Sequence, residues 1–366
     1  MEEHVNITDS KIKALEEELS TTKYNKRTQH HIGLVKAKIA RLKEEQEKRA
    51  GKSGAKIGFA VKKTGDASVA ILGFPSVGKS TLINKLTNAE SKVGSYDFTT
   101  LNCIPGMMFY NNARIQLLDM PGIIEGASKS RGRGREALSI IRNCDLILIL
   151  IDKIAQLAIT KNELRNANFR INSHKPDVII KPTGKGGIRV LSTVKLTRID
   201  KKTIEEILKE YRVTNAEVVI RENIDIDGFV DVLAKNICYV DAVIVFNKID
   251  LLNQVEIENI KKNIPGAILI SADANLNLEE LRERIFQKLK LIRIYLKKIS
   301  KEPDMNEPLI MKEGSTIKNA CEKLHREFLN KFKYARVWGQ SAKFPGQVHQ
   351  LSHTLKDKDI IEIHLN

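Results

Sequence analysis

The sequence is poor in cysteine and lacks any long hydrophobic run. Only four of its 366 residues are cysteine, and no two of them form a Cys-x-x-Cys pair. Scattered thiols of this kind fit a reducing compartment and argue against disulfides or a zinc site. The longest apolar run that resembles a strand, Leu146 to Ile151, is far too short to span a bilayer. The charged N-terminus is unlike a signal peptide, so we expect a soluble, cytoplasmic protein with no membrane insertion.

Acidic residues are too few to balance the basic ones. The chain has 61 Lys and Arg against 45 Asp and Glu, which leaves a net charge of +16. A surface of this kind favours polyanionic partners, with nucleic acid first and anionic membrane second, although it can also serve solubility alone. The length predicts two or three domains, and a hydrophobic share of 42% is enough to form their cores.

Residues 73–80 read Gly-Phe-Pro-Ser-Val-Gly-Lys-Ser, a phosphate-binding loop of the pattern Gly-x-x-x-x-Gly-Lys-Ser. An apolar run at 68–72 predicts a strand just before it, and 81–86 predicts the start of a helix. Gly73 and Gly78 let the backbone wrap closely around phosphates, and the amides of the turn and of the helix N-terminus point at negative charge. This context predicts a nucleotide site.

Within this loop, two side chains have distinct predicted roles. Lys79 would reach the terminal phosphates, and the hydroxyl of Ser80 would bind Mg²⁺. The remaining contacts to the nucleotide are expected from Pro75, Ser76, Val77 and Thr81.

A second motif, Asp119-Met120-Pro121-Gly122, follows the predicted strand 115–118. Asp119 at a strand end can hold Mg²⁺ through water, and the Gly122 amide can contact the γ-phosphate. Between the loop and this motif lie Thr99 and Thr100, either of which can complete the magnesium shell and sense the γ-phosphate. We choose Thr100 as the metal ligand and assign it a catalytic role with Lys79 and Gly122.

Two further motifs indicate which base is bound. Asn247-Lys248-Ile249-Asp250 follows the predicted strand 243–246. Asp250 can accept two hydrogen bonds from guanine, and adenine has no such pair of donors. Lys248 would lie along the plane of the base.

After the next strand, Ser271 and Ala272 would place a backbone amide near the guanine carbonyl. The order of all these motifs along the chain predicts a GTP site, whereas an ATP-dependent small-molecule kinase would share only the phosphate loop.

The apolar strands that precede the motifs are continuous rather than alternating, as in a sheet covered on both faces. This predicts a doubly wound α/β domain over 67–290. Lys79 and Asn247 are 168 residues apart, more than the intervening strands of a compact GTPase require. The surplus matches a small α/β module at 153–238, which we place as an insertion within the domain.

The two ends of the chain have different patterns. Residues 1–66 predict a basic helical hairpin, with Thr8 or Asp9 as a cap of the first helix. From Lys23 to Lys63 there are thirteen Lys and Arg against three Glu, which favours an RNA contact or a solvated charged helix. Residues 291–366 show the strand, strand, helix, strand order of a β-grasp fold, with one helix over 316–332.

With these motifs the chain resembles the developmentally regulated GTP-binding proteins, a branch of the Obg-related GTPases. The residues that carry the resemblance are 73–80, Asp-Phe-Thr-Thr-Leu at 97–101, Asp-Met-Pro-Gly-Ile-Ile-Glu-Gly-Ala at 119–127, 247–250 and 271–272. The resemblance covers nearly the whole chain. It implies an insertion like a ribosomal-protein domain, a C-terminal TGS domain, association with ribosomes or ribosomal RNA, and GTP hydrolysis stimulated by K⁺.

The chain departs from Ras-like GTPases at Ile123, where a glutamine would orient the attacking water. Hydrolysis should therefore be slow and require a monovalent cation or a regulatory protein partner. Ser76 stands where related potassium-activated GTPases often have Asn, so K⁺ rests on the resemblance alone. The four basic residues within 128–135 favour a contact with phosphate or RNA, or a solvated loop. The rival interpretation is an RNA-binding protein whose nucleotide site is structural and does not hydrolyse GTP.

Overall fold

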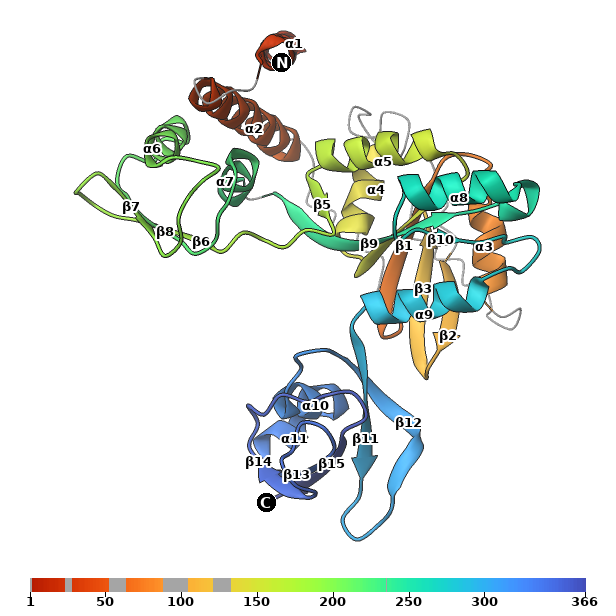
Figure 1. The fold of residues 1–366 in the computed structure, drawn as a ribbon. Coiled ribbons are helices and arrows are strands. Elements are labelled where there is room, and N and C mark those ends of the chain that lie inside the picture. The colour runs from red at the N-terminus through yellow and green to blue at the C-terminus, as the bar shows by residue number, and fades with distance from the viewer. Residues whose placement is uncertain (1, 24–27, 53–63, 88–104, 121–132, 235) are drawn as a thin grey trace. The chain divides into compact units, whose positions relative to one another are not determined.

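The structure is a computed structural model that describes residues 2–23, 28–52, 64–87, 105–120, 133–234 and 236–366. The chain divides into two compact units, and Figure 1 shows their elements. One unit comprises residues 1–58 and 168–239, and the other comprises 59–167 and 240–366. The predicted N-terminal helices thus pack with the predicted insertion.

A mostly parallel sheet forms the centre of the larger unit. Its strand order is β10-β9-β4-β1-β3-β2, with β5 (Phe169–Ile171) pairing β9 off this path. These strands are β1 (Ala67–Gly73), β2 (Pro105–Tyr110), β3 (Ala113–Asp119), β4 (Leu146–Ile151), β9 (Cys238–Phe246) and β10 (Ile268–Leu269). Every residue of β1 and β4 is buried, so the sheet is covered on both faces and the predicted doubly wound class is confirmed.

The edge strand β2 runs antiparallel to its neighbour β3. The sequence pattern did not indicate this strand. Gly106 within it is required by close packing, because a Cβ there would lie 2.5 Å from Cγ2 of Thr87. The strands β1, β3, β4, β9 and β10 are parallel, so their carboxyl ends lie at one edge of the sheet, where ligands bind in this class of fold.

Helices follow the strands of this unit and cover the sheet. They are α3 (Lys79–Leu86), α4 (Arg133–Arg142), α5 (Ile154–Asn166), the 3₁₀ turn η1 (Ile249–Leu251), α8 (Gln254–Asn263) and α9 (Leu278–Lys288). The apolar faces of α3 and α9 join one core cluster, in which Leu82 of α3 and Leu281 of α9 are fully buried with Leu148 of β4.

The C-terminal segment forms a second sheet, of order β12-β11-β15-β13-β14. Its elements are β11 (Leu291–Lys297), β12 (Pro303–Lys312), α10 (Ile317–Leu324), α11 (Arg326–Asn330), β13 (Phe332–Trp338), β14 (Gln347–His349) and β15 (Ile360–Leu365). Cys321 of α10 is buried against Val337 and Ile361 of the sheet. This is the expected β-grasp arrangement.

The predicted single helix over 316–332 was wrong, because the structure has two. His325 separates α10 from α11 with an extended backbone, φ −167° and ψ 142°. The ring nitrogen of His325 then accepts a hydrogen bond from the amide of Glu327, at 3.3 Å, and so caps α11.

The smaller unit contains the helical hairpin and a three-stranded sheet of order β6-β8-β7. The elements are α1 (Glu2–Thr21), α2 (Gln29–Lys52), β6 (Val178–Pro182), β7 (Ile188–Ser192), α6 (Lys201–Glu210), β8 (Ala216–Ile220) and α7 (Ile226–Leu233). Ile12, Val35 and Ile39 pack between the two helices of the hairpin, as expected. The predicted cap was wrong, since α1 begins at Glu2 and Thr8 lies inside it.

Candidate functional site

The phosphate loop lies between β1 and α3, as its flanking residues predicted. Gly78 has a left-handed backbone, φ +94°, and a Cβ there would lie 2.5 Å from Nδ2 of Asn247. A Cβ at Gly73 would lie 2.6 Å from the carbonyl oxygen of Leu150. Both positions therefore require glycine, because the loop passes too close to neighbouring strands for any side chain.

Lys79 is held across this loop by the carbonyl groups that it faces. Its Nζ donates to the oxygens of Gly73 and Phe74, both at 3.0 Å. Partial burial lowers the pKa of the Lys79 ammonium, and the carboxylate of Asp119 acts in the opposite direction. The Lys79 ammonium thus lies beside the loop carbonyl groups, where a bound phosphate would compensate for its loss of hydration.

Asp119 and Ser80 meet at the carboxyl end of β3. The Ser80 hydroxyl donates to Oδ2 of Asp119 at 3.2 Å. The other carboxylate oxygen, Oδ1, is buried and has no hydrogen-bond partner among the described residues. A hydroxyl and an orphaned carboxylate oxygen beside a lysine are the hard oxygen donors that fit Mg²⁺.

Asn247 joins the two halves of the predicted site. Its side chain is only 3% exposed. Nδ2 donates to the carbonyl oxygen of Val77 in the phosphate loop at 2.8 Å, and Oδ1 accepts from the amide of Ala272 at 3.0 Å. One amide side chain therefore fixes the phosphate loop against the segment after β10, where Ser271 is fully buried.

Asp250 lies in η1 and is exposed, with no partner among the described residues. Lys248, two residues before it, has a left-handed backbone with φ +66°. Its Nζ donates to the carbonyl oxygen of Ser76 at 2.7 Å and to Oδ2 of Asp152 at 2.8 Å. Lys248 is therefore held beside the phosphate loop while the Asp250 carboxylate stays available.

Asp152 and Gln156 belong to this cluster, and sequence reasoning missed them. Gln156 donates to Oδ1 of Asp152 at 2.8 Å and accepts from the Asp152 amide at 2.9 Å. Burial by itself raises the pKa of Asp152, but the hydrogen bonds from Lys248 and Gln156 outweigh it and hold the pKa below its usual value. The available signal was a carboxylate directly after the apolar strand 146–151.

Three residues with predicted roles fall outside the described residues. They are Thr100, Gly122 and Ile123. Of the remaining loop positions, Pro75 lies in the turn before α3 and Thr81 lies in the first turn of α3. In the part of the chain that the structure describes, no helix is both long and apolar enough to cross a membrane.

Family models and known relatives match nearly the whole chain. The family model described as "50S ribosome-binding GTPase" matches residues 68–181, that of the C-terminal region of the same domain matches 185–291, and the TGS domain matches 292–365. An uncharacterized GTP-binding protein of Methanocaldococcus jannaschii is 52% identical over 361 residues, 97% of this chain and 92% of that protein. The human developmentally-regulated GTP-binding protein 2 is 42% identical over 359 residues, 96% and 98% of the two chains. Among solved structures, the Schizosaccharomyces pombe YchF GTPase aligns with a TM-score of 0.47 at 15% identity, covering 83% of this chain and 99% of that one.

The fold and the family matches define a P-loop GTPase domain followed by a TGS domain. Within that class, the chain belongs to the developmentally regulated GTP-binding protein family.

Proposed function

We propose that the chain binds and hydrolyses GTP as a molecular switch that acts on ribosomes or another part of the translation apparatus. The observation that supports this best is the Asn247 side chain, which ties the phosphate loop to the segment after β10. The residues predicted to hold phosphate and those predicted to hold guanine are thus parts of one cluster.

On the phosphate side, Lys79 contacts the terminal phosphates, while the amides of the loop and of Thr81 donate to phosphate oxygens. Ser80 and Thr100 would hold Mg²⁺ directly, with Asp119 behind a water molecule; the ion would neutralise charge on the phosphates. The Gly122 amide contacts the γ-phosphate. On the base side, Asp250 accepts from guanine and Lys248 lies along the ring.

Hydrolysis by the chain alone should be slow, because Ile123 has no group that can orient water. A bound K⁺ or a regulatory partner would provide the group that orients the attacking water. The ribosome role is supported by the net charge of +16 and by the description of the family model that matches residues 68–181. We further propose that the protein works in the cytoplasm.

Phosphate release from γ-labelled GTP tests this function, measured with and without K⁺ and with and without ribosomes. We expect slow turnover that K⁺ or ribosomes stimulate. In the same assay the variant Asp250→Asn should turn over xanthosine triphosphate in preference to GTP, because the guanine donors lose their acceptor.

Two results would contradict the proposal. Turnover without K⁺ or ribosomes at the fully stimulated rate would refute the proposed requirement for a cation or a partner. Tight GTP binding with no phosphate release under any of these conditions would favour the rival, an RNA-binding protein with a structural nucleotide site.

A further inference from the structure

The inserted module carries a dense run of positive charge. Residues 181–202 contain seven basic residues against one acidic residue, Asp200. The run extends from the end of β6, through the following loop and β7, to the first turn of α6. All seven basic residues are exposed, and they are Lys181, Lys185, Arg189, Lys195, Arg198, Lys201 and Lys202. We call residues 181–202 the basic surface.

Several basic side chains elsewhere in this unit are used differently from those of the basic surface. They bind carboxylates: Lys36 meets Asp227 at 2.6 Å, and Arg170 meets Asp231 at 2.6 Å. Among the described residues, no side chain of the seven forms an ion pair or a hydrogen bond. Their charges therefore contribute nothing to holding this unit together.

The nearest carboxylate on the sheet does not neutralise the basic surface. Glu217 of β8 lies in register between Lys181 and Arg189. Among the described residues, no ion pair joins it to either side chain, and the two basic residues outnumber it. The exposed side of this row of the sheet is thus positive overall.

The first turn of α6 shows that the charge opposes local stability. Lys201 and Lys202 are its first two residues, and the turn contains no acidic side chain. Cations at a helix N-terminus are unfavourable, because the free amides there already carry positive partial charge. Asp200 reduces this unfavourable interaction only by capping the helix, where its side chain accepts a hydrogen bond from the Thr203 amide at 2.7 Å. A phosphate bound at this turn would be stabilised by both the amides and the lysines.

We propose that the basic surface binds the phosphate backbone of structured RNA. The surface contains no aromatic residue on which an unpaired base could stack, so it suits a duplex recognised through its backbone rather than a single strand. The loop before β7 allows close approach, since a Cβ at Gly184, Gly186 or Gly187 would meet nothing within 4 Å. A membrane surface is disfavoured because interfacial segments carry Trp or Phe beside their basic residues. The inference deepens the proposed association with ribosomal RNA and rests on it.

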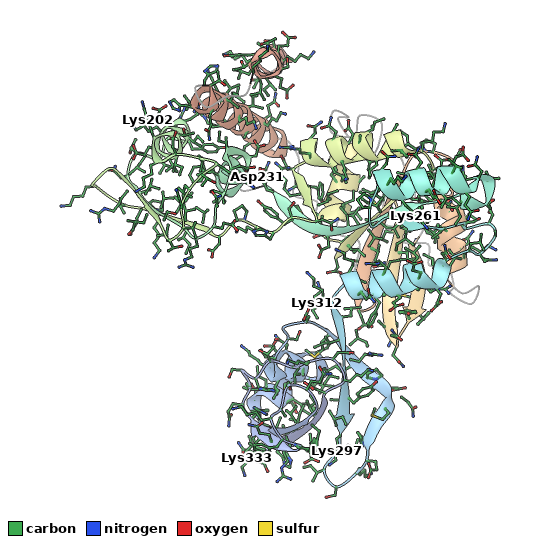
Figure 2. All side chains as sticks on the ribbon, in the orientation of Figure 1. Lys202, Asp231, Lys261, Lys297, Lys312 and Lys333 are labelled. Atoms are coloured by element: carbon green, nitrogen blue, oxygen red, sulfur yellow. The ribbon has the colours of Figure 1, made fainter. Side chains whose placement is uncertain are left out.

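The test uses the full chain, two variants and a matched control. Lys201→Gln/Lys202→Gln removes the pair at the start of α6, and Lys181→Gln/Lys185→Gln/Arg189→Gln removes the charge at the other end of the surface. The control Lys261→Gln/Lys262→Gln removes two exposed lysines from the last turn of α8. Figure 2 labels Lys202 and Lys261, one of each pair.

Binding of a fluorescein-labelled RNA duplex is followed by anisotropy between about 50 and about 200 mM KCl. The slope of log K against log salt should fall by about 0.9 for each phosphate that the protein no longer neutralises, so by nearly two for the pair variant. We expect the affinity at the low-salt end to fall roughly tenfold in both variants. The control should keep the wild-type slope. Thermal unfolding should show the Lys201→Gln/Lys202→Gln protein at least as stable as the wild type, because the helix dipole penalty is removed.

Unchanged RNA affinity and salt slope in both variants would overturn the inference. The inference would also be overturned if the variants bound RNA normally but lost binding to phosphatidylserine vesicles or to polyglutamate. Ribosome co-sedimentation of the wild type separates this from the proposed function. If the wild type does not sediment with ribosomes but binds the duplex through these residues, only the ribosome role is refuted. If the wild type sediments with ribosomes and the variants bind RNA normally, only the proposed RNA binding by the basic surface is refuted.

Discussion

Lys248 is the residue on which three segments of the GTPase domain converge. Its backbone follows β9, its ammonium donates to the Ser76 carbonyl of the phosphate loop, and it pairs with Asp152 at the end of β4. A flexible side chain with four rotatable bonds loses much entropy when it is fixed, so two strong acceptors are needed to hold it. We infer that Asp152 is a positioning residue for Lys248.

The variant Asp152→Asn should weaken GDP and GTP binding. It removes a charged hydrogen bond from a carboxylate that is 18% exposed, which costs about 1.5 kcal/mol or roughly tenfold in affinity. Stopped-flow dissociation of a fluorescent GDP analogue measures the change, which we expect mainly in the off-rate. The discrimination between GTP and XTP should stay, since we propose that Asp250 provides it.

The matched control for that experiment is Asp273→Asn, an exposed aspartate of the same domain that follows Ala272. If Asp152→Asn released GDP at the rate of this control, Lys248 would be held adequately by Ser76 alone and the positioning role would be wrong.

At the scale of elements, helix α2 is part of two cores. One face packs on α1, and Ala37 on another is fully buried among residues of the inserted module, including Ile204 and Phe229. Gly33 lies at the same contact, where a Cβ would be 3.0 Å from Cγ2 of Thr203 on α6. The N-terminal hairpin therefore completes the hydrophobic core of a module that begins more than a hundred residues later.

Replacing Gly33 by leucine should loosen the inserted module. The added side chain has no room against α6, and overpacking of this kind costs about 1–3 kcal/mol. Hydrogen exchange should rise in β7, β8 and α6 while β1 and β4 keep their protection. Gly184→Ala is the control, because nothing lies within 4 Å of its Cβ. Equal protection in Gly33→Leu and wild type would show that α2 does not support the module.

At the scale of the larger unit, three aspartates lie at the end of the sheet opposite the phosphate loop. Asp66 directly precedes β1, and Asp241 lies in β9 opposite the first residue of β4. Asp145 directly precedes β4, and its side chain is only 9% exposed. Three lysines neutralise these aspartates, two of them in the C-terminal segment and one directly before it. The pairs are Lys312 with Asp145 at 2.5 Å, Lys323 with Asp66 at 3.0 Å, and Lys290 with Asp241 at 3.2 Å. The TGS domain is thus attached to the GTPase domain partly by charge.

Reversal of two of these charges, Lys312→Glu/Lys323→Glu, should detach the TGS domain. Each substituted position would face a carboxylate of like charge, and repulsion at the buried Asp145 is screened less than at an exposed site. Small-angle scattering should show a larger radius of gyration than that of the wild type, and salt should narrow the difference. Lys318→Glu is the control, since Lys318 pairs with Glu322 of its own helix. A wild-type radius in the double variant would mean that apolar contacts alone hold the domain.

The sequence by itself determined the parts of this protein whose physics is local. The phosphate loop, the buried strands and the position of residues 247–250 after a strand were predictable, because glycine positions, continuous apolar runs and fixed spacing act over a few residues. The break at His325 was missed, since the apolar spacing of residues 317–328 suits one helix and the kink comes from the backbone of a single residue.

Only the tertiary structure decided what depends on distant pairing. Asp152 meets Lys248 across two adjacent strands that are nearly a hundred residues apart in the chain. Likewise, Ala37 is buried by the inserted module rather than by its own hairpin. Such contacts follow from strand order and helix packing, which hydrophobic periodicity does not encode, so no local pattern could have placed these residues together.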